Sequence, residues 1–270
     1  MTDSKKEKTI NILLTAVLTV SAVFTAFSAS RVSVLKKAFD EKNAVYTALA
    51  ESCAEVRDMS AINGSKAESP GKKGSAFPVL ADFASLNEKC AFGSAAGWVY
   101  CPDTVINYPV LQCDDNYYYL HHLIDGTENG GGTLYCDYRC ESCFSGQSTI
   151  VYGHHMTDGS MLASIQKYYK EEDYYSAHPV IYLATPNGNY ILEVFSAFAT
   201  TTEDDKSFAC TFSSDYSFGD YIEHLKGMNS IPGGTDIEVG AGDRVVSFVT
   251  CAYHVNNGRS ILSCKMNKVE

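Results

Sequence analysis

The stretch of sequence that decides the fold is VVSFVTCAYHVNNGRSILSCK, residues 245–265. Two apolar runs rich in β-branched residues flank a short polar loop, which predicts two strands that are neighbours in a sheet. The first strand delivers Cys251 at its end, and Arg259 stands at the start of the second. The pattern therefore places a thiol beside a guanidinium at one end of a strand pair.

A thiol and a guanidinium side by side suit acyl transfer. A thiolate attacks a peptide carbonyl, and a nearby fixed cation stabilises the negative charge that the carbonyl oxygen gains. Arginine fits this role because it stays protonated and offers several directed donors. A strand cysteine taken alone is more often a buried small hydrophobic side chain, so this stretch by itself does not favour catalysis.

A second stretch, QSTIVYGHHMTDGSML at residues 147–162, ends another predicted strand in His154 and His155. An imidazole at a strand end is well placed to take or give a proton in a cleft. A solvent-exposed turn or a fragment of a metal site would explain the same two histidines. Only together with Cys251 and Arg259 do the histidines favour a catalytic site.

Outside these two stretches, short apolar runs recur between turn signals, which is typical of a mainly β domain. Helices are expected over 160–168 and 216–226, the second with Phe218, Tyr221, Ile222 and Leu225 on one face. Pro186-Asn187-Gly188 predicts a hairpin turn. We expect a closed or nearly closed β-barrel of about eight strands with helical insertions and an N-terminal helical segment. The expected strands are 98–100, 105–108, 133–138, 149–152, 180–184, 190–200, 244–250 and 260–266.

The N-terminal part of the chain has an uncharged run from residue 9 to residue 30, long enough to cross a hydrocarbon layer of ~30 Å as a helix. The lysines that precede it favour a cytoplasmic N-terminus, although Arg31, Lys36 and Lys37 weaken the asymmetry of charge. A cleaved signal peptide is the alternative, because Ala26-Phe27-Ser28 has the small residues that a peptidase needs. Either reading makes the rest of the chain exported.

The expected organisation follows from the composition of successive segments. Residues 31–62 are rich in Ala, Lys and Glu at helical spacing, whereas residues 63–76 are rich in Gly, Pro, Ser and Lys. We expect a cytoplasmic N-terminus over 1–8, a transmembrane signal-anchor over 9–30, a juxtamembrane helical stalk over 31–62, a flexible linker over 63–76 and an extracellular domain over 77–270.

Charge and cysteine content narrow the function further. The formal net charge of -11 argues against a nucleic-acid partner, because neutralising phosphates needs a clustered basic surface. Ten cysteines in an exported chain would usually indicate a disulfide framework. If Cys251 is a free thiolate, an odd number remains, so at least one more thiol is free or bonded elsewhere.

The two site stretches together resemble the sortases, and in detail the class B sortases. That family's nucleophile lies in a Thr-Leu-x-Thr-Cys strand end, which residues 247–251 match only at Thr250 and Cys251. The family's histidine directly follows Tyr-Gly, as His154 does here, so His154 is preferred over His155.

The resemblance extends over roughly residues 86–266. GWVYCPDTVINYPVLQCDDNYYYLHH at residues 97–122 looks like the class B opening, and FSSDYSFGDYIEHLKG at residues 212–227 looks like the helix that precedes the nucleophile strand. These motifs occur in the family's order. They imply the closed sortase-type β-barrel.

The resemblance implies a two-step acyl transfer that needs no cofactor and no metal. Cys251 would attack the carbonyl of a threonine in the C-terminal sorting signal of a surface protein, forming a thioester. A peptidoglycan precursor amine, or a pilin lysine, would resolve it. His154 would protonate the leaving amine and deprotonate the incoming one, Arg259 would steady the oxyanion or the peptide backbone, and Thr250 would line the peptide groove. The domain at 77–270 would then be catalytic, extracellular and anchored in the cell membrane by one span.

Other readings of the same residues remain open. A hydrolytic cysteine peptidase would use the same Cys, His and Arg side chains with water as the acceptor. A pilin-polymerising sortase would differ only in its acceptor amine. An exported binding module without activity would have Cys251 buried or bonded.

Cys136, Cys140 and Cys143 copy the spacing of cysteines that hold an iron–sulfur cluster in radical enzymes. An oxidising location is hostile to such a cluster, and the paired Cys-x-x-Cys spacing of a structural zinc site is missing. A surface loop with one disulfide or with free thiols is the preferred interpretation.

Overall fold

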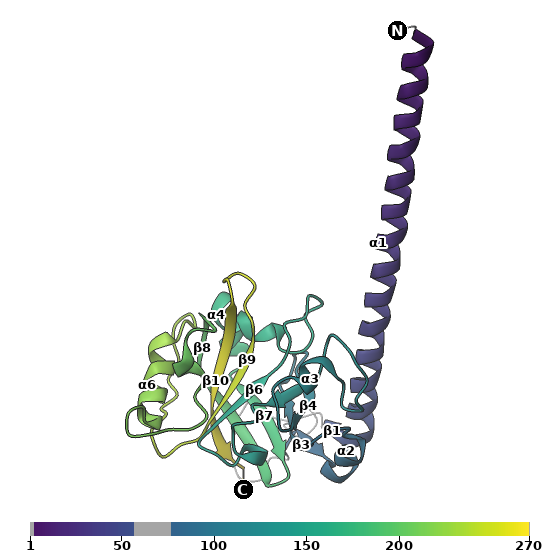
Figure 1. Ribbon diagram of the computed structural model, residues 1–270. Helices are drawn as coiled ribbons and strands as arrows, with labels where there is room; N and C mark the ends of the chain where they lie inside the picture. The colour runs from purple at the N-terminus through teal and green to yellow at the C-terminus, as the bar shows by residue number, and fades with distance from the viewer. Residues whose placement is uncertain (1–2, 57–76, 270) are drawn as a thin grey trace. The chain divides into compact units, whose positions relative to one another are not determined.

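The computed structural model describes residues 3–56 and 77–269 (Figure 1). The predicted linker at 63–76 lies outside the described residues. By their internal contacts, the residues form two compact units, Met1–Ala44 and Val45–Glu270.

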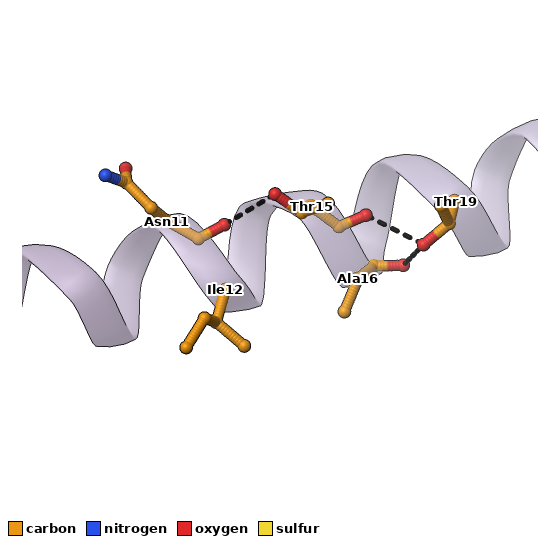
Figure 2. Close-up of a pocket in the computed structure, with 5 residues that line it drawn as sticks. All are labelled: Asn11, Ile12, Thr15, Ala16 and Thr19. Carbon is orange, nitrogen blue, oxygen red and sulfur yellow. Dashed lines mark hydrogen bonds between the residues drawn. The ribbon is translucent and has the colours of Figure 1, made fainter.

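The first unit is almost wholly the N-terminal part of helix α1 (Asp3–Cys53). Its apolar side chains, such as Leu13, Val20 and Phe24, are exposed. The helix is long and apolar enough to cross a membrane, by length and composition. Figure 2 shows two threonine hydroxyls that donate hydrogen bonds to carbonyls of the same helix. Thr15 Oγ1 donates to the Asn11 carbonyl at 2.8 Å, and Thr19 Oγ1 donates to the Thr15 carbonyl at 2.8 Å. Such internal hydrogen bonds make hydroxyls compatible with hydrocarbon.

The second unit is built on a closed β-barrel. Within residues 77–269 its strands follow the order β10-β8-β7-β3-β4-β5-β6-β9, and β9 pairs with β10 to close the ring. The β4–β5 and β6–β9 pairs are parallel and the others antiparallel. The prediction of a closed barrel is confirmed. The eight strands are β3 (Ser94–Tyr100), β4 (Asn107–Gln112), β5 (Leu134–Cys136), β6 (Ser148–Tyr152), β7 (Val180–Thr185), β8 (Gly188–Thr201), β9 (Val245–Cys251) and β10 (Gly258–Lys268).

The two faces of the barrel strands are buried differently. Inside the barrel, residues such as Trp98, Phe248 and Leu262 form the main core. Outside it, Val249 and Ile261 join a second cluster beneath helix α6 (Phe218–Met228). Successive side chains of a strand alternate between faces, so one strand serves both clusters.

The prediction of an amphipathic helix before the strand that ends at Cys251 is confirmed. Helix α6 buries Phe218, Tyr221, Ile222 and Leu225, and it lies beside β8 (Figure 1). It begins two residues later than predicted because the Ser217 side chain accepts from the Asp220 backbone and closes a capping box.

The helix predicted over 160–168 is instead a 3₁₀ turn, η3 (Ala163–Gln166), followed by the short helix α4 (Lys167–Lys170). Met161 has a φ of 58°, in the left-handed region, so a right-handed helix cannot run through it. The hairpin predicted at 186–188 joins β7 and β8, and only Gly188 needs a positive φ, of 134°. The remaining short helices are α2 (Phe83–Lys89), α3 (Tyr118–His121), η2 (Ser142–Phe144), α5 (Tyr174–Ala177) and η4 (Asp205–Phe208).

The C-terminal end of α1 belongs to the barrel unit. Leu49 and Cys53 are buried, and the Tyr46 hydroxyl donates to the Gly132 carbonyl. After Cys53 the chain forms β1 (Ala54–Val56), which pairs with β2 (Val79–Ala81). The helix therefore ends earlier than the stalk predicted over 31–62, because this strand pairing replaces helical hydrogen bonds.

Candidate active site

Cys251 and Arg259 lie directly opposite each other on β9 and β10. Directly opposite residues of an antiparallel pair project to the same face of the sheet, so the thiol and the guanidinium share one side. Alternation along β9 puts Cys251 on the face of Val249, outside the barrel, as the packing of the second cluster shows. The sequence predicted that Cys251 and Arg259 lie together because it predicted this pair of neighbouring strands.

The loop between these strands closes tightly. The Ala252 amide donates to the Gly258 carbonyl at 3.0 Å, and the Gly258 amide donates to the Val255 carbonyl at 3.0 Å. A Cβ at Gly258 would lie 2.4 Å from the Ala252 carbonyl oxygen. Only glycine fits there, so Gly258 fixes the register that pairs Cys251 with Arg259.

His154 reaches the same end of the barrel from β6. Strand β6 runs parallel to β9 with Tyr152 opposite Val249, and the Gly153 amide extends the ladder by donating to the Val249 carbonyl at 3.1 Å. His154 Nε2 lies 2.8 Å from the Leu120 carbonyl oxygen. A carbonyl only accepts, so Nε2 carries a proton, and in the neutral ring Nδ1 is the nitrogen that can accept one.

His155 is engaged elsewhere. Its Nδ1 donates to the Cys251 carbonyl at 2.9 Å, and its Nε2 accepts from the side-chain amide of Gln166 at 3.1 Å. The Tyr253 hydroxyl donates to the His155 carbonyl at 3.0 Å. His155 therefore ties the end of β9 to η3, a role that no sequence motif indicated.

A groove with a volume of about 580 Å³ is lined by residues of β9, of β10 and of the segment that follows β6. It brings together all four residues singled out from the sequence, His154, Thr250, Cys251 and Arg259. The other lining residues are Asn116, Leu120, Tyr135, Arg139, Tyr152, Gly153, Thr202, Asp205, Phe208 and Val249.

Thr250 differs from the other three residues. It lies between Val249 and Cys251 on β9, so its side chain points to the opposite face, into the barrel. Its Oγ1 is buried and has no hydrogen-bond partner among the described residues. We infer that Thr250 lines the groove with its backbone.

An ion pair between the exposed side chain of Arg139, which lines the groove, and the buried carboxyl of Asp137 lies at one side of the groove. Arg139 Nε donates to Asp137 Oδ1 at 2.9 Å, and Arg139 Nη2 to Asp137 Oδ2 at 2.7 Å. Burial alone would raise the pKa of the Asp137 carboxyl, but the hydrogen bonds from Arg139 outweigh it and hold that pKa below its usual value. The Tyr152 hydroxyl donates to Asp137 at 3.1 Å, and burial raises its pKa, so it stays protonated. The sequence did not point to this cluster.

The three cysteines with iron–sulfur spacing do not converge. Cys136 is buried, and burial raises its pKa, whereas Cys140 lies against Cys210 with the two Sγ atoms 2.7 Å apart. All ten cysteines are free in this structure. Among the residues that the structure describes, no three His, Cys, Asp or Glu side chains gather as a candidate metal site.

Known proteins match both the sequence and the barrel, although no family model matches the chain. The chain is 32% identical to sortase B of Listeria monocytogenes over 211 residues, which cover 77% of this chain and 82% of that protein. It is 32% identical to sortase B of Staphylococcus aureus over 175 residues, covering 64% and 70% of the two chains.

Solved structures agree with these relatives. A complex of S. aureus sortase B with its substrate superimposes with a TM-score of 0.63 at 30% identity, covering 70% of this chain and 85% of that chain. Sortase B from L. monocytogenes gives a TM-score of 0.58 at 34% identity, covering 67% and 97%. Barrel, motif order and sequence identity agree, and the chain belongs to the class B sortases.

Proposed function

We propose that the protein is a membrane-anchored cysteine transpeptidase with Cys251 as nucleophile, His154 as proton-transfer partner and Arg259 as electrostatic helper. It cleaves a C-terminal sorting signal of surface proteins after threonine and joins the protein to a peptidoglycan amine. The observation that carries this proposal is the convergence of the three side chains, from β6, β9 and β10, on one groove outside the barrel.

The first half of the reaction forms a thioester. Cys251 Sγ attacks the threonine carbonyl as a thiolate, and the C–N bond breaks as His154 gives a proton to the leaving amine. The guanidinium of Arg259 stabilises the negative oxygen of the tetrahedral intermediate. One hydrogen bond, from Arg259 Nη1 to the Gly258 carbonyl at 2.9 Å, orients that guanidinium in advance.

The second half reverses the proton movement. The acceptor amine attacks the thioester carbonyl and gives a proton to neutral His154, and Cys251 leaves as a thiolate. Because the Leu120 carbonyl holds the proton on Nε2, Nδ1 is the nitrogen that exchanges protons with the two amines.

The relatives support the choice of substrates. One solved S. aureus sortase B is in complex with a substrate, and another sortase B structure is in complex with triglycine. By analogy, the groove takes an extended sorting-signal peptide, and an amine enters after the leaving segment has gone. The long apolar helix α1 is compatible with a single membrane span. The lysines that precede the apolar run favour the barrel outside the cell.

The test uses the full-length chain in detergent, because the end of α1 is part of the barrel unit. A panel of threonine-containing sorting peptides is incubated with and without triglycine, and the products are identified by mass spectrometry beside a Cys251→Ala control. Cleavage after threonine with a triglycine adduct, absent from the control, supports the transpeptidase. Cleavage that yields only the free acid would assign the site to a hydrolytic peptidase, and transfer only to a lysine peptide would indicate pilin polymerisation.

A further inference from the structure

Cys140 and Cys210 form a close thiol pair beside the groove. Their Sγ atoms are 2.7 Å apart, although the residues are separated by 70 positions in the sequence. A disulfide bond is about 2.05 Å long, so a movement of less than about 1 Å would join the two sulfurs. None of the steps proposed for acyl transfer uses either thiol.

The backbone around the pair is already held in place. The Ser148 hydroxyl donates to the Ala209 carbonyl at 3.0 Å, and Arg139 Nη2 donates to the Phe208 carbonyl at 3.4 Å. At Cys140, the side-chain amide of Gln112 donates to the Cys140 carbonyl at 3.0 Å. These hydrogen bonds keep the two sulfurs within about 1 Å of the length of a disulfide, so the bond needs only a small movement of either segment.

The pair links two segments that line the groove. Cys210 ends the segment that supplies Thr202, Asp205 and Phe208 to the groove, and Cys140 follows Arg139, another lining residue. Between β8 and α6 this segment has one short 3₁₀ turn as regular structure, η4 (Asp205–Phe208). A covalent link at Cys210 would therefore restrict a wall that secondary structure holds weakly.

We propose that Cys140 and Cys210 are a reversible redox crosslink that fixes this wall of the groove. The oxidant is a small-molecule or protein disulfide. The contact with Cys140 raises the pKa of Cys210, but Cys210 is the more exposed thiol and the one that the oxidant can reach. It attacks one sulfur of the oxidant and forms a mixed disulfide while the other sulfur leaves as a thiolate. Cys140 then attacks Cys210 Sγ and expels the second sulfur. Two protein thiols lose two protons and two electrons, one S–S bond forms in the protein, and the oxidant's S–S bond is reduced to two thiols.

The surroundings of Cys140 favour the closing step. In the mixed disulfide Cys210 Sγ has no hydrogen to donate, and the Ile150 amide, 3.4 Å from Cys140 Sγ, is the donor that still lowers the pKa of Cys140. Cys140 is thus the thiol better able to act as the attacking thiolate in the closing step.

The test is independent of transpeptidase activity. The full-length Cys251→Ala chain in detergent is incubated with oxidised glutathione or with a reductant, digested and mapped by mass spectrometry. The proposal expects a Cys140–Cys210 linked peptide in the oxidised sample, lost on reduction. Hydrogen exchange over residues 202–210 should be at least about 10-fold slower in the oxidised state.

Two variants, each made in the Cys251→Ala chain, distinguish a reaction of the Cys140–Cys210 pair from reactions of other thiols. Cys210→Ser should abolish both the linked peptide and the change in exchange, whereas Cys143→Ser, which removes a neighbouring thiol of the same segment, should leave both unchanged. No linked peptide at glutathione concentrations that oxidise other thiols would overturn the crosslink. A linked peptide with equal exchange in the two states would overturn its effect on the groove wall.

Discussion

Gly153 offers a sharp test of how the barrel positions His154. A Cβ at this position would lie 2.3 Å from Leu134 Cδ2 and 3.0 Å from Leu162 Cδ1. Carbon atoms in contact are normally about 3.5–4.0 Å apart, so the closer pair is short by more than about 1 Å. Leu134 and Leu162 are fully buried, so their side chains can give way only by displacing other core residues. In Gly153→Ala we therefore expect the backbone of residues 153–154 to shift as well.

Two effects of known size follow from that movement. Overpacking should lower the free energy of unfolding by about 1–3 kcal/mol. A shift of about 1 Å at a catalytic group should lower kcat/KM for peptide transfer by about 10- to 100-fold. Denaturant unfolding and the triglycine transfer assay measure the two. Gly130→Ala is the matched control, because Gly130 is exposed and a Cβ there meets nothing within 4 Å.

A double-mutant cycle identifies the cause. Leu134→Ala removes the methyl group that clashes, so Gly153→Ala should cost at least about 1 kcal/mol less stability in the Leu134→Ala background than in the wild type. Purely additive costs, or a Gly153→Ala variant with unchanged kcat/KM, would refute this account of how His154 is positioned.

Three further predictions concern other residues of the site. His154→Ala should lower kcat/KM by about 10²- to 10⁴-fold. His155→Ala should lower the free energy of unfolding by about 1–2 kcal/mol and keep more than about a tenth of the activity. Equal losses of activity in the two variants would contradict the choice of His154 over His155 as the proton-transfer partner. Thr250→Val should raise the free energy of unfolding by about 1 kcal/mol in a denaturant titration and leave KM for peptide unchanged, because the lost hydroxyl has no partner among the described residues; a raised KM would show that the hydroxyl binds substrate. Arg139→Gln should destabilise the protein by about 1–2 kcal/mol at neutral pH, and since the pKa of Asp137 is depressed, the difference from wild type should shrink as pH falls below about 4 and Asp137 becomes protonated. A difference in unfolding free energy that is constant with pH would mean that the ion pair is not its source.

The barrel could be predicted from the sequence because its strands are marked locally. The β-branched runs around Val246, Ile150 and Leu192 all became strands, and the turn residues at 186–188 fixed one hairpin. Where local signals were overridden, the cause was a tertiary contact. The left-handed φ at Met161, for example, is held in part by the hydrogen bond from its amide to the Tyr108 hydroxyl.

The candidate site could be predicted only in part. Cys251 and Arg259 are close in sequence and lie on paired strands, so their proximity follows from local pattern. The anchoring of His155 to the Cys251 carbonyl and the contact of Cys140 with Cys210 join segments that are far apart in the chain. No spacing rule connects such segments, because their meeting depends on the closure of the whole barrel.

Detection of the acyl-enzyme is the direct test of whether Cys251 is the nucleophile. The full-length chain is mixed with an intact sorting peptide that it has been found to cleave, in the absence of amine. The reaction is quenched at low pH and the protein is mapped by mass spectrometry. If Cys251 is the nucleophile, a hydroxylamine-sensitive adduct forms on Cys251, carries the peptide up to its threonine and disappears when triglycine is added. An adduct on another cysteine, or cleavage that persists in Cys251→Ala, would contradict the assignment of Cys251 as the nucleophile.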